Sequence, residues 1–153
     1  QIAFYEGIMP VCKDETGVTV VMGHEIAHAI ARHGNERMSQ QLLIQLGGVA
    51  LSEALKNEKE QTMQLAMLAF GVGSTLGVQL PYSRKHESEA DELGIYFMAM
   101  AGYDPREAPL FWERMQAQGG EQPPEFLSTH PHPTNRISDL QKHMAKAMEY
   151  YNQ

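Results

Sequence analysis

The sequence predicts a mainly α-helical fold of the α+β class, formed by one domain over residues 1–153. Hydrophobic residues make up 42% of the chain and charged residues 20%, a balance typical of a folded domain. Apolar residues recur with a helical period through most of the chain. Strand-like alternation of apolar and polar residues is confined to positions 1–11. We therefore expect a short N-terminal strand region followed by helices.

The first elements follow from this patterning. "QIAFYEGIMPV" at residues 1–11 is expected to be extended, and "CKDETG" to turn the chain. From Val18 to His33 the pattern becomes helical, with an alanine-rich surface that indicates burial. Gly34 is a natural end for that helix. "NERMSQQLLIQLGGVALSEAL" then resumes a helical period.

The segment from Gln61 to Ser83 contains no charged residue, and its length approaches that of a membrane span. Glycines, glutamines and hydroxyl groups dilute its hydrophobicity. We expect a buried helix followed by a glycine-rich loop, with Pro81 breaking the chain. Membrane contact through this segment is the alternative.

The C-terminal half predicts three more helices. "RKHESEADELGIYFMAMAGY" forms the first, closed by Gly102. "DPREAPLFWERMQAQGG" forms the second, with Asp104 as its cap and Pro105 at the first helical position. "EQPPEFLSTHPHP" reads as a proline-rich loop. An amphipathic helix from about Thr134 to Tyr151 ends the chain.

Charge and cysteine content limit the classes of function. Twelve basic and nineteen acidic residues give a net charge of -7, which argues against nucleic acid as the main partner. The single cysteine, Cys12, excludes an internal disulfide. Because the chain begins at Gln1 and not at Met, we expect a processed product, truncated at its N-terminal side, which leaves room for a signal or a membrane anchor before it.

A histidine pair and a glutamate in "GHEIAHAIARHG" carry the first chemical signal. His24 and His28 are four residues apart, so a helix projects both from one face, where both imidazoles reach one zinc ion. Glu25 lies next to the first histidine, within reach of a water on that ion. This H-E-x-x-H pattern is a metalloprotease signature, although it also occurs by chance on ordinary helices.

The third ligand has to come from elsewhere in the chain. His33 does not fit the extended H-E-x-x-H-x-x-G-x-x-H pattern, because Ala31 and Gly34 stand where glycine and histidine are needed. The remaining acids and histidines are the candidates: His86, Glu87, Glu89, Asp91, Glu92, His130, His132 and His143.

Helical spacing favours Glu87 among these candidates. Glu87 and Asp91 share one stripe with the small residues Ala90 and Gly94, which suits close packing. Acids on a packed face need an explanation, and a metal supplies one. Asp91 then accepts a hydrogen bond from a ligand histidine or from the substrate.

Ordinary surface chemistry explains the other acids of this helix. Glu89 and Glu92 lie on a different face, with Tyr96, where solvated charges are expected. For Asp91 the alternative to a role at the metal is an ion pair with Arg84 or Arg136. Two histidines and one glutamate leave a fourth zinc position open, as in catalytic sites.

Three blocks in order, "GHEIAHAIARHG", "SRKHESEADELG" and "LSTHPHPTNRI", resemble a family of zinc endopeptidases. This family includes the type-one CAAX prenyl endopeptidase, HtpX and BepA, and the chain is most similar to its soluble or lipid-anchored bacterial members. The resemblance covers nearly the whole chain. It implies a zincin-like catalytic core with an H-E-x-x-H helix and a glutamate helix.

The resemblance also implies residue roles. The family pattern H-E-x-x-H followed by E-x-x-x-D falls on the residues chosen above, with Glu87 as ligand and Asp91 as a supporting or proton-donating residue. His130 resembles a histidine near the metal that either stabilises the transition state or blocks the open position. Arg136 is expected near the site too. A loop-fixing hydrogen bond for His130 and a charge pair for Arg136 are the structural alternatives.

The function expected from these observations is zinc-dependent hydrolysis of peptide bonds. One zinc ion per chain, held by His24, His28 and Glu87, activates a water whose proton Glu25 accepts. His130, Arg136 or Asp91 then donates to the oxyanion.

The resemblance places this activity in protein quality control, in the bacterial periplasm or at a membrane, on protein or peptide substrates bound as extended strands. The alternatives are a zinc-containing, chaperone-like binding module without turnover, whose apolar 61–83 segment holds clients, and a structural helical protein without metal.

Overall fold

The computed structural model describes residues 6–117, 130 and 135–153. These residues form helices and no strand, so the expected mainly α fold is confirmed. The expected N-terminal strand is wrong over residues 6–11, which form the short helices η1 (Glu6–Ile8) and α1 (Met9–Cys12). Ile8, Val11 and Cys12 are buried there, so the apolar positions pack as helical neighbours.

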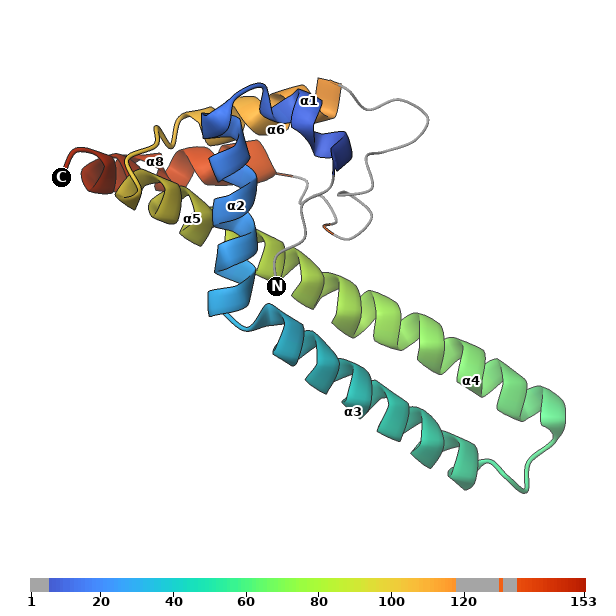
Figure 1. The fold of residues 1–153 in the computed structure, drawn as a ribbon. Helices are drawn as coiled ribbons and strands as arrows, with labels where there is room; N and C mark the ends of the chain where they lie inside the picture. Colours follow the sequence, from blue (N-terminus) through green and yellow to red (C-terminus); the bar gives the residue numbers. More distant parts are fainter. Residues whose placement is uncertain (1–5, 118–129, 131–134) are drawn as a thin grey trace. The chain divides into compact units, whose positions relative to one another are not determined.

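The chain groups into two compact units, one of residues 1–31 and 84–153 and one of residues 32–83. Unit 1 contains α2 (Glu15–Ile30), most of α5 (Leu80–Met100), α6 (Glu107–Ala117) and α8 (Arg136–Tyr151) (Figure 1). Its hydrophobic core brings together residues from all four of these helices and from α1, among them Val11, Val20, Ile95, Phe111, Trp112, Met115 and Leu140.

The helix that carries the histidine pair, α2, begins earlier than expected. Asp14 caps it, since its Oδ1 accepts a hydrogen bond from the Gly17 backbone N–H at 3.0 Å. The helix ends at Ile30, before Arg32 with φ 58°, and Gly34 lies inside the next helix. The turn therefore falls two residues before the expected glycine.

Close packing of α2 on α5 depends on two glycines. A Cβ atom built on Gly23 would lie 2.7 Å from the carbonyl oxygen of Gly94, and one built on Gly94 would lie 3.0 Å from the backbone nitrogen of His24. The two backbones therefore approach more closely than any side chain allows. This contact lies directly beside His24 and sets the distance between the histidines of α2 and the acids of α5.

The remaining ends of unit 1 are close to those expected. Gly102, with φ 84°, follows the end of α5 and its N–H bonds to the Ala99 carbonyl. Asp104 precedes α6, but its carboxylate accepts from Arg106, and α6 begins only at Glu107. The expected 121–133 loop lies outside the described residues except for His130.

Unit 2 is a hairpin of α3 (His33–Ala54) and α4 (Glu60–Ser74), which lie side by side (Figure 1). Phe70 of α4 packs over Gly47 and Gly48 of α3. After α4 a π-helical turn, η2 (Thr75–Gln79), leads directly into α5.

The expectation for residues 61–83 is therefore wrong on three points. The segment is helical throughout, without a glycine-rich loop. None of the residues of α4 or η2 is buried. Pro81 does not break the chain: the Leu80 N–H bonds back to the Thr75 carbonyl across the wide turn, and Pro81 follows in the first turn of α5, where a proline needs no N–H partner.

Candidate metal centre

Four side chains converge in unit 1: His24, His28, Glu87 and His130, whose potential ligand atoms all lie within 4.8 Å of one another. The two α2 histidines point to the same place because they are one helical turn apart. Their Nε2 atoms are 3.1 Å apart. From α5, the two carboxylate oxygens of Glu87 lie 3.2 Å from Nε2 of His24 and 3.3 Å from Nε2 of His28.

His130 completes the group. Its Nδ1 lies 3.2 Å from Glu87 Oε1 and 3.3 Å from His24 Nε2, so His130 stands where the sequence predicts an open fourth position. Its Nε2 lies 3.2 Å from Oε1 of Glu25. His130 thus connects the predicted base to the predicted ligands.

Asp91 and Arg136 form hydrogen bonds with the proposed ligands on the side away from the cluster. Oδ1 of Asp91 accepts a hydrogen bond from Nδ1 of His24 at 2.9 Å, which orients the imidazole so that its Nε2 faces the cluster. Arg136 donates to both oxygens of Asp91, at 2.5 and 2.9 Å, and to Glu87 Oε2 at 3.1 Å. Both interactions considered for Asp91, the histidine and the arginine, are therefore present together.

Trp112 is the part of this site that sequence reasoning missed. Its ring lies 3.6 Å from the Arg136 guanidinium carbon, a cation–π contact, and 6.3 Å from the His24 ring centre. Both Trp112 and Arg136 are buried. From the sequence, a tryptophan on the apolar side of this helix is expected to be an ordinary core residue. No sequence pattern indicates that its ring packs against a buried arginine.

In this cluster burial and hydrogen bonding shift the pKa values of the side chains in opposite directions. Glu87 is fully buried, which alone would raise its pKa, but hydrogen bonds from His130, His24 and His28 outweigh burial and hold that pKa far below its ordinary range. Burial would lower the pKa of His24, yet the hydrogen bonds to Asp91 and Glu87 raise it overall. Glu87 is therefore held as a carboxylate among the three histidines.

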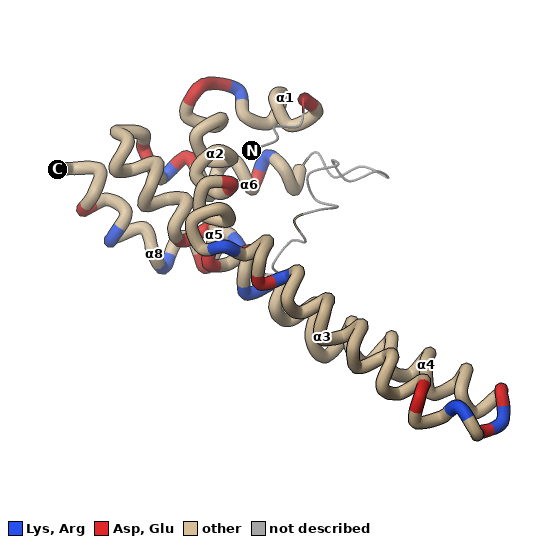
Figure 2. The backbone as a smooth tube through the Cα atoms, turned by 60° about the horizontal axis from the view of Figure 1, so that its bottom comes forward, with Lys and Arg blue, Asp and Glu red and all other residues tan. Residues whose placement is uncertain are grey.

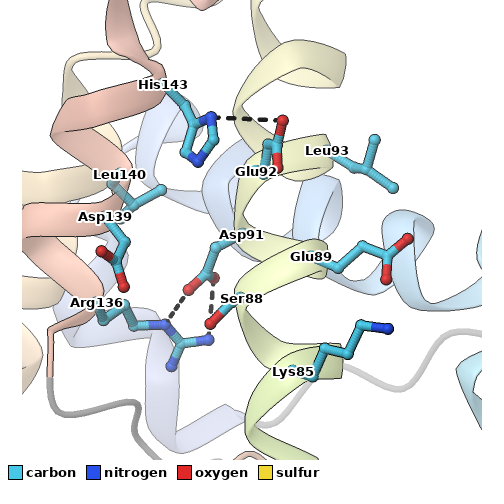
Figure 3. A pocket seen from close by; sticks show the side chains of 10 residues that line it. All are labelled: Lys85, Ser88, Glu89, Asp91, Glu92, Leu93, Arg136, Asp139, Leu140 and His143. Atoms are coloured by element: carbon cyan, nitrogen blue, oxygen red, sulfur yellow. Dashed lines mark hydrogen bonds and ion pairs between the residues drawn. The ribbon is translucent and has the colours of Figure 1, made fainter.

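A pocket of about 500 Å³ opens between α5 and α8 on the outer side of this site (Figure 3). Asp91 and Arg136 point toward each other at its floor, while Glu92 and His143 form a separate pair with Nδ1 3.4 Å from Oε1. Tyr96 donates to Glu92 at 3.0 Å, and burial together with Glu92 raises its pKa to about 12.

The other candidate ligands do not join the cluster. Glu89 is exposed, and Glu92 is half-buried and bonded to Tyr96. His86 is buried, although it is outside the group of converging ligand atoms. His33 begins α3, and His132 lies outside the described residues.

Comparison with known proteins gives a family and several relatives. The model of peptidase family M48 matches residues 1–144. The mitochondrial metalloendopeptidase OMA1 of Saccharomyces cerevisiae is 34% identical over all of this chain and 44% of its own length. Human OMA1 is 32% identical over 97% of the chain and 30% of its own length. The β-barrel assembly-enhancing protease of Escherichia coli is 31% identical over 90% of the chain and 29% of its own length. No solved structure matches. The chain thus spans less than half of the length of these relatives.

Proposed function

This chain belongs to peptidase family M48, and from that premise we propose that it is a zinc-dependent endopeptidase. The observation that carries the proposal is the convergence of His24, His28 and Glu87 with Glu25 connected to them through His130. The relatives are named as metalloendopeptidases or proteases, which supports the same activity. A binding module without turnover has no use for a base held beside a metal site.

The donor set fits a zinc ion. Zinc with nitrogen and oxygen ligands at about 2.0–2.1 Å in a tetrahedron separates those ligands by roughly 3.3 Å. The two Nε2 atoms are 3.1 Å apart, and each lies near one oxygen of the Glu87 carboxylate, His24 at 3.2 Å from Oε2 and His28 at 3.3 Å from Oε1. Asp91, which accepts from His24 Nδ1, leaves the lone pair of Nε2 directed at the other ligands. We therefore propose these three residues as ligands of one zinc ion per chain.

When bound, zinc lowers the pKa of a water that it coordinates and polarises the scissile carbonyl. Glu25 accepts the proton of the attacking water and delivers it to the leaving amine. Its half-buried carboxylate lies 3.2 Å from His130 Nε2, at the edge of the cluster, and this proximity supports the proposed role. His130 Nδ1 lies 3.3 Å from His24 Nε2 and 3.2 Å from Glu87 Oε1, where it would be the fourth ligand of a bound zinc ion. His130 would then have to move before a water enters, and in its new place it could donate to the oxyanion.

Asp91 and Arg136 act as positioning residues in this proposal. Arg136 donates to Glu87 and Asp91 from a buried guanidinium, so its charge supports the ligands and does not face a substrate. Of the three oxyanion donors that the sequence suggests, the geometry therefore favours His130.

We also propose protein or peptide substrates, bound in extended form by analogy with proteins that recognise peptides as an added strand. The proposed place of action is the bacterial periplasm or a membrane surface, in quality control of envelope proteins. The names of the relatives, one β-barrel assembly-enhancing and others mitochondrial, support this setting. The proposed catalytic domain spans residues 1–153, with every candidate site residue in unit 1.

The test compares casein cleavage by wild type, Glu25→Gln and the matched control Glu89→Gln, an exposed glutamate of α5. We expect Glu25→Gln to bind one zinc and to lose about 100-fold or more in kcat/KM, while the control keeps its rate. The same pair is measured in a His130→Ala background, where the fourth position is free. A zinc-loaded chain that cleaves nothing in either background, or one indifferent to Glu25, overturns the proposal.

A further inference from the structure

The hairpin of residues 32–83 has apolar side chains on two opposite faces of each helix. On α3 the inward, half-buried positions include Ile44, Gly47 and Leu51, which recur at helical spacing. On α4 the inward positions include Met67 and Phe70, and Phe70 meets Gly47. These contacts account for one face of each helix.

The outward faces are apolar as well. Leu42, Leu46 and Val49 on α3 are 56%, 57% and 68% exposed, and they recur at the same spacing as the inward set. On α4, Leu65 and Leu68 are 68% and 65% exposed. Exposed glutamines, Gln41 and Gln45 on α3 and Gln64 on α4, lie among these leucines, so the polar groups of these faces are few and uncharged. Outward faces of this kind are unusual in water and favour an apolar environment.

Charged residues are confined to the two ends of the hairpin, with tan, uncharged helices between them (Figure 2). Residues 38–52 and 61–83 contain no Asp, Glu, Lys or Arg. Arg37 precedes the first run, and a charged tip follows it, formed by Glu53, Lys56, Glu58, Lys59 and Glu60.

The length of these runs matches the apolar layer of a membrane. At 1.5 Å per residue, the stretch from Arg37 to Glu53 is about 24 Å long, and 61–83 is about 33 Å long. The hydrocarbon core is about 30 Å thick. By length and composition alone, Glu60–Met100 is the one helical run in the described part of the chain that is long and apolar enough to cross a membrane, and its apolar stretch contains no buried residue.

We propose that the hairpin of residues 32–83 inserts between the acyl chains of a lipid bilayer, with its two charged ends in the headgroup layers. The inference deepens the membrane setting proposed above and rests on it only for the place of action. Arg37, Lys56 and Lys59 have side chains long enough to reach headgroups from the ends of the apolar runs, which would cover the shortfall in α3.

Lipid is favoured over a protein partner because the hairpin exposes apolar side chains on two opposite sides, one on α3 and one on α4. A second copy of the chain, or a client segment, covers one face of a helix pair and leaves the other in water. Acyl chains surround the hairpin and cover Leu46 and Leu68 at the same time. They also need no complementary charge, and the uncharged runs offer none.

The first test is flotation of the full chain with vesicles of phosphatidylcholine containing a minority of phosphatidylglycerol. We expect the wild type to float, and Leu42→Glu/Leu46→Glu on α3 and Leu68→Glu/Val72→Glu on α4 each to reduce the floated fraction more than about tenfold. The control is Leu110→Glu on α6, a leucine 48% exposed in unit 1, which is expected to float like wild type.

A gentler substitution keeps the inference testable if the glutamate variants unfold. A nitroxide label on Val49→Cys or Val72→Cys is expected to become accessible to dissolved oxygen and shielded from a water-soluble nickel chelate when vesicles are added. The same label on Asn57→Cys, at the tip, is expected to stay accessible to the chelate. The native Cys12 is buried and does not compete for the label.

Three results overturn the inference: a wild type that does not float, labels on both helices that stay accessible to the chelate, or a soluble dimer that the glutamate pairs dissociate. An effect of the α4 pair without one of the α3 pair excludes insertion of the hairpin as a whole. Zinc content and casein cleavage in detergent are measured on the same samples. Failure of insertion with intact cleavage, or the reverse, separates this inference from the proposed function.

Discussion

Gly23 and Gly94 face each other where α2 packs on α5, and a Cβ atom on either one would approach the other helix's backbone to 2.7 or 3.0 Å. Backbone atoms cannot move aside as a side chain does. This pair therefore fixes how closely the histidine helix and the glutamate helix approach.

Gly94→Ala is expected to lower the free energy of unfolding by about 1–3 kcal/mol, because the new methyl group forces the two helices apart. Zinc affinity should fall with it, since His24 and Glu87 then separate. Urea unfolding and zinc titration measure the two effects. Gly34→Ala is the control: it lies in α3 with nothing within 4 Å of the added Cβ, so equal losses in both variants would contradict the explanation.

Glu87→Gln is expected to remove most bound zinc, because an amide is a poor zinc ligand and the carboxylate is fully buried among the histidines. Glu89→Gln, with the same change two residues away on the exposed face, should keep one zinc per chain. Metal analysis after dialysis decides between them. Zinc lost from Glu89→Gln and retained by Glu87→Gln would reverse the choice of ligand.

His130→Ala is expected to keep zinc, since three ligands remain, and to cleave a short peptide faster than wild type, because access of water to the metal gains more than the loss of one oxyanion donor costs. The physical reason is that His130 Nδ1, 3.3 Å from His24 Nε2, would occupy the fourth ligand position of a bound zinc ion. Steady-state rates on the peptide check this. A slower variant with full zinc content would show instead that His130 acts mainly on the transition state.

Asp91→Asn is expected to destabilise the metal-free protein by about 3–5 kcal/mol at neutral pH, because Arg136 is left buried without its main partner. Burial opposes the charge of Asp91, but Arg136 and His24 outweigh it and hold its pKa below the ordinary 3.8. The carboxylate thus stabilises the fold above that pH, and this contribution is lost as the pH falls through the lower folded value.

Urea unfolding in the presence of a chelator, at a series of pH values, measures both parts of this prediction. The wild type should lose its advantage over Asp91→Asn as the solution becomes more acidic than the ordinary pKa of the carboxyl group. A constant difference between the two proteins across that range would show that the ion pair does not stabilise the fold.

The family and the mainly α fold were predictable because their signals are local. Helical spacing alone brings His24 and His28 to one face, and the stripe of α5 places Glu87 with Asp91 on its packed side. The match to peptidase family M48 confirms the resemblance drawn from the three motifs. The residue roles themselves stay predictions until variants are measured.

The errors arise where tertiary context overrides a local pattern. Alternation at residues 6–11 resembles a strand, yet Ile8 and Val11 pack as a helix against unit 1. A proline such as Pro81 normally interrupts a helix. Here a π-helical turn precedes it, in which the Leu80 N–H bonds to the Thr75 carbonyl, and Pro81 falls in the first turn of α5. The contact between Trp112 and Arg136 joins α6 to α8, so the spacing of residues within one helix cannot predict it.

Trp112 is the only tryptophan of the chain, and it lies against Arg136 with its ring centre 6.3 Å from that of His24. Its emission therefore comes from one place, next to a proposed ligand. A change in the charge on His24, or a shift of the guanidinium, alters the electric field across the indole. The protein therefore carries an optical reporter of its proposed metal centre, and we expect the binding of zinc there to change the emission of the unlabelled wild type.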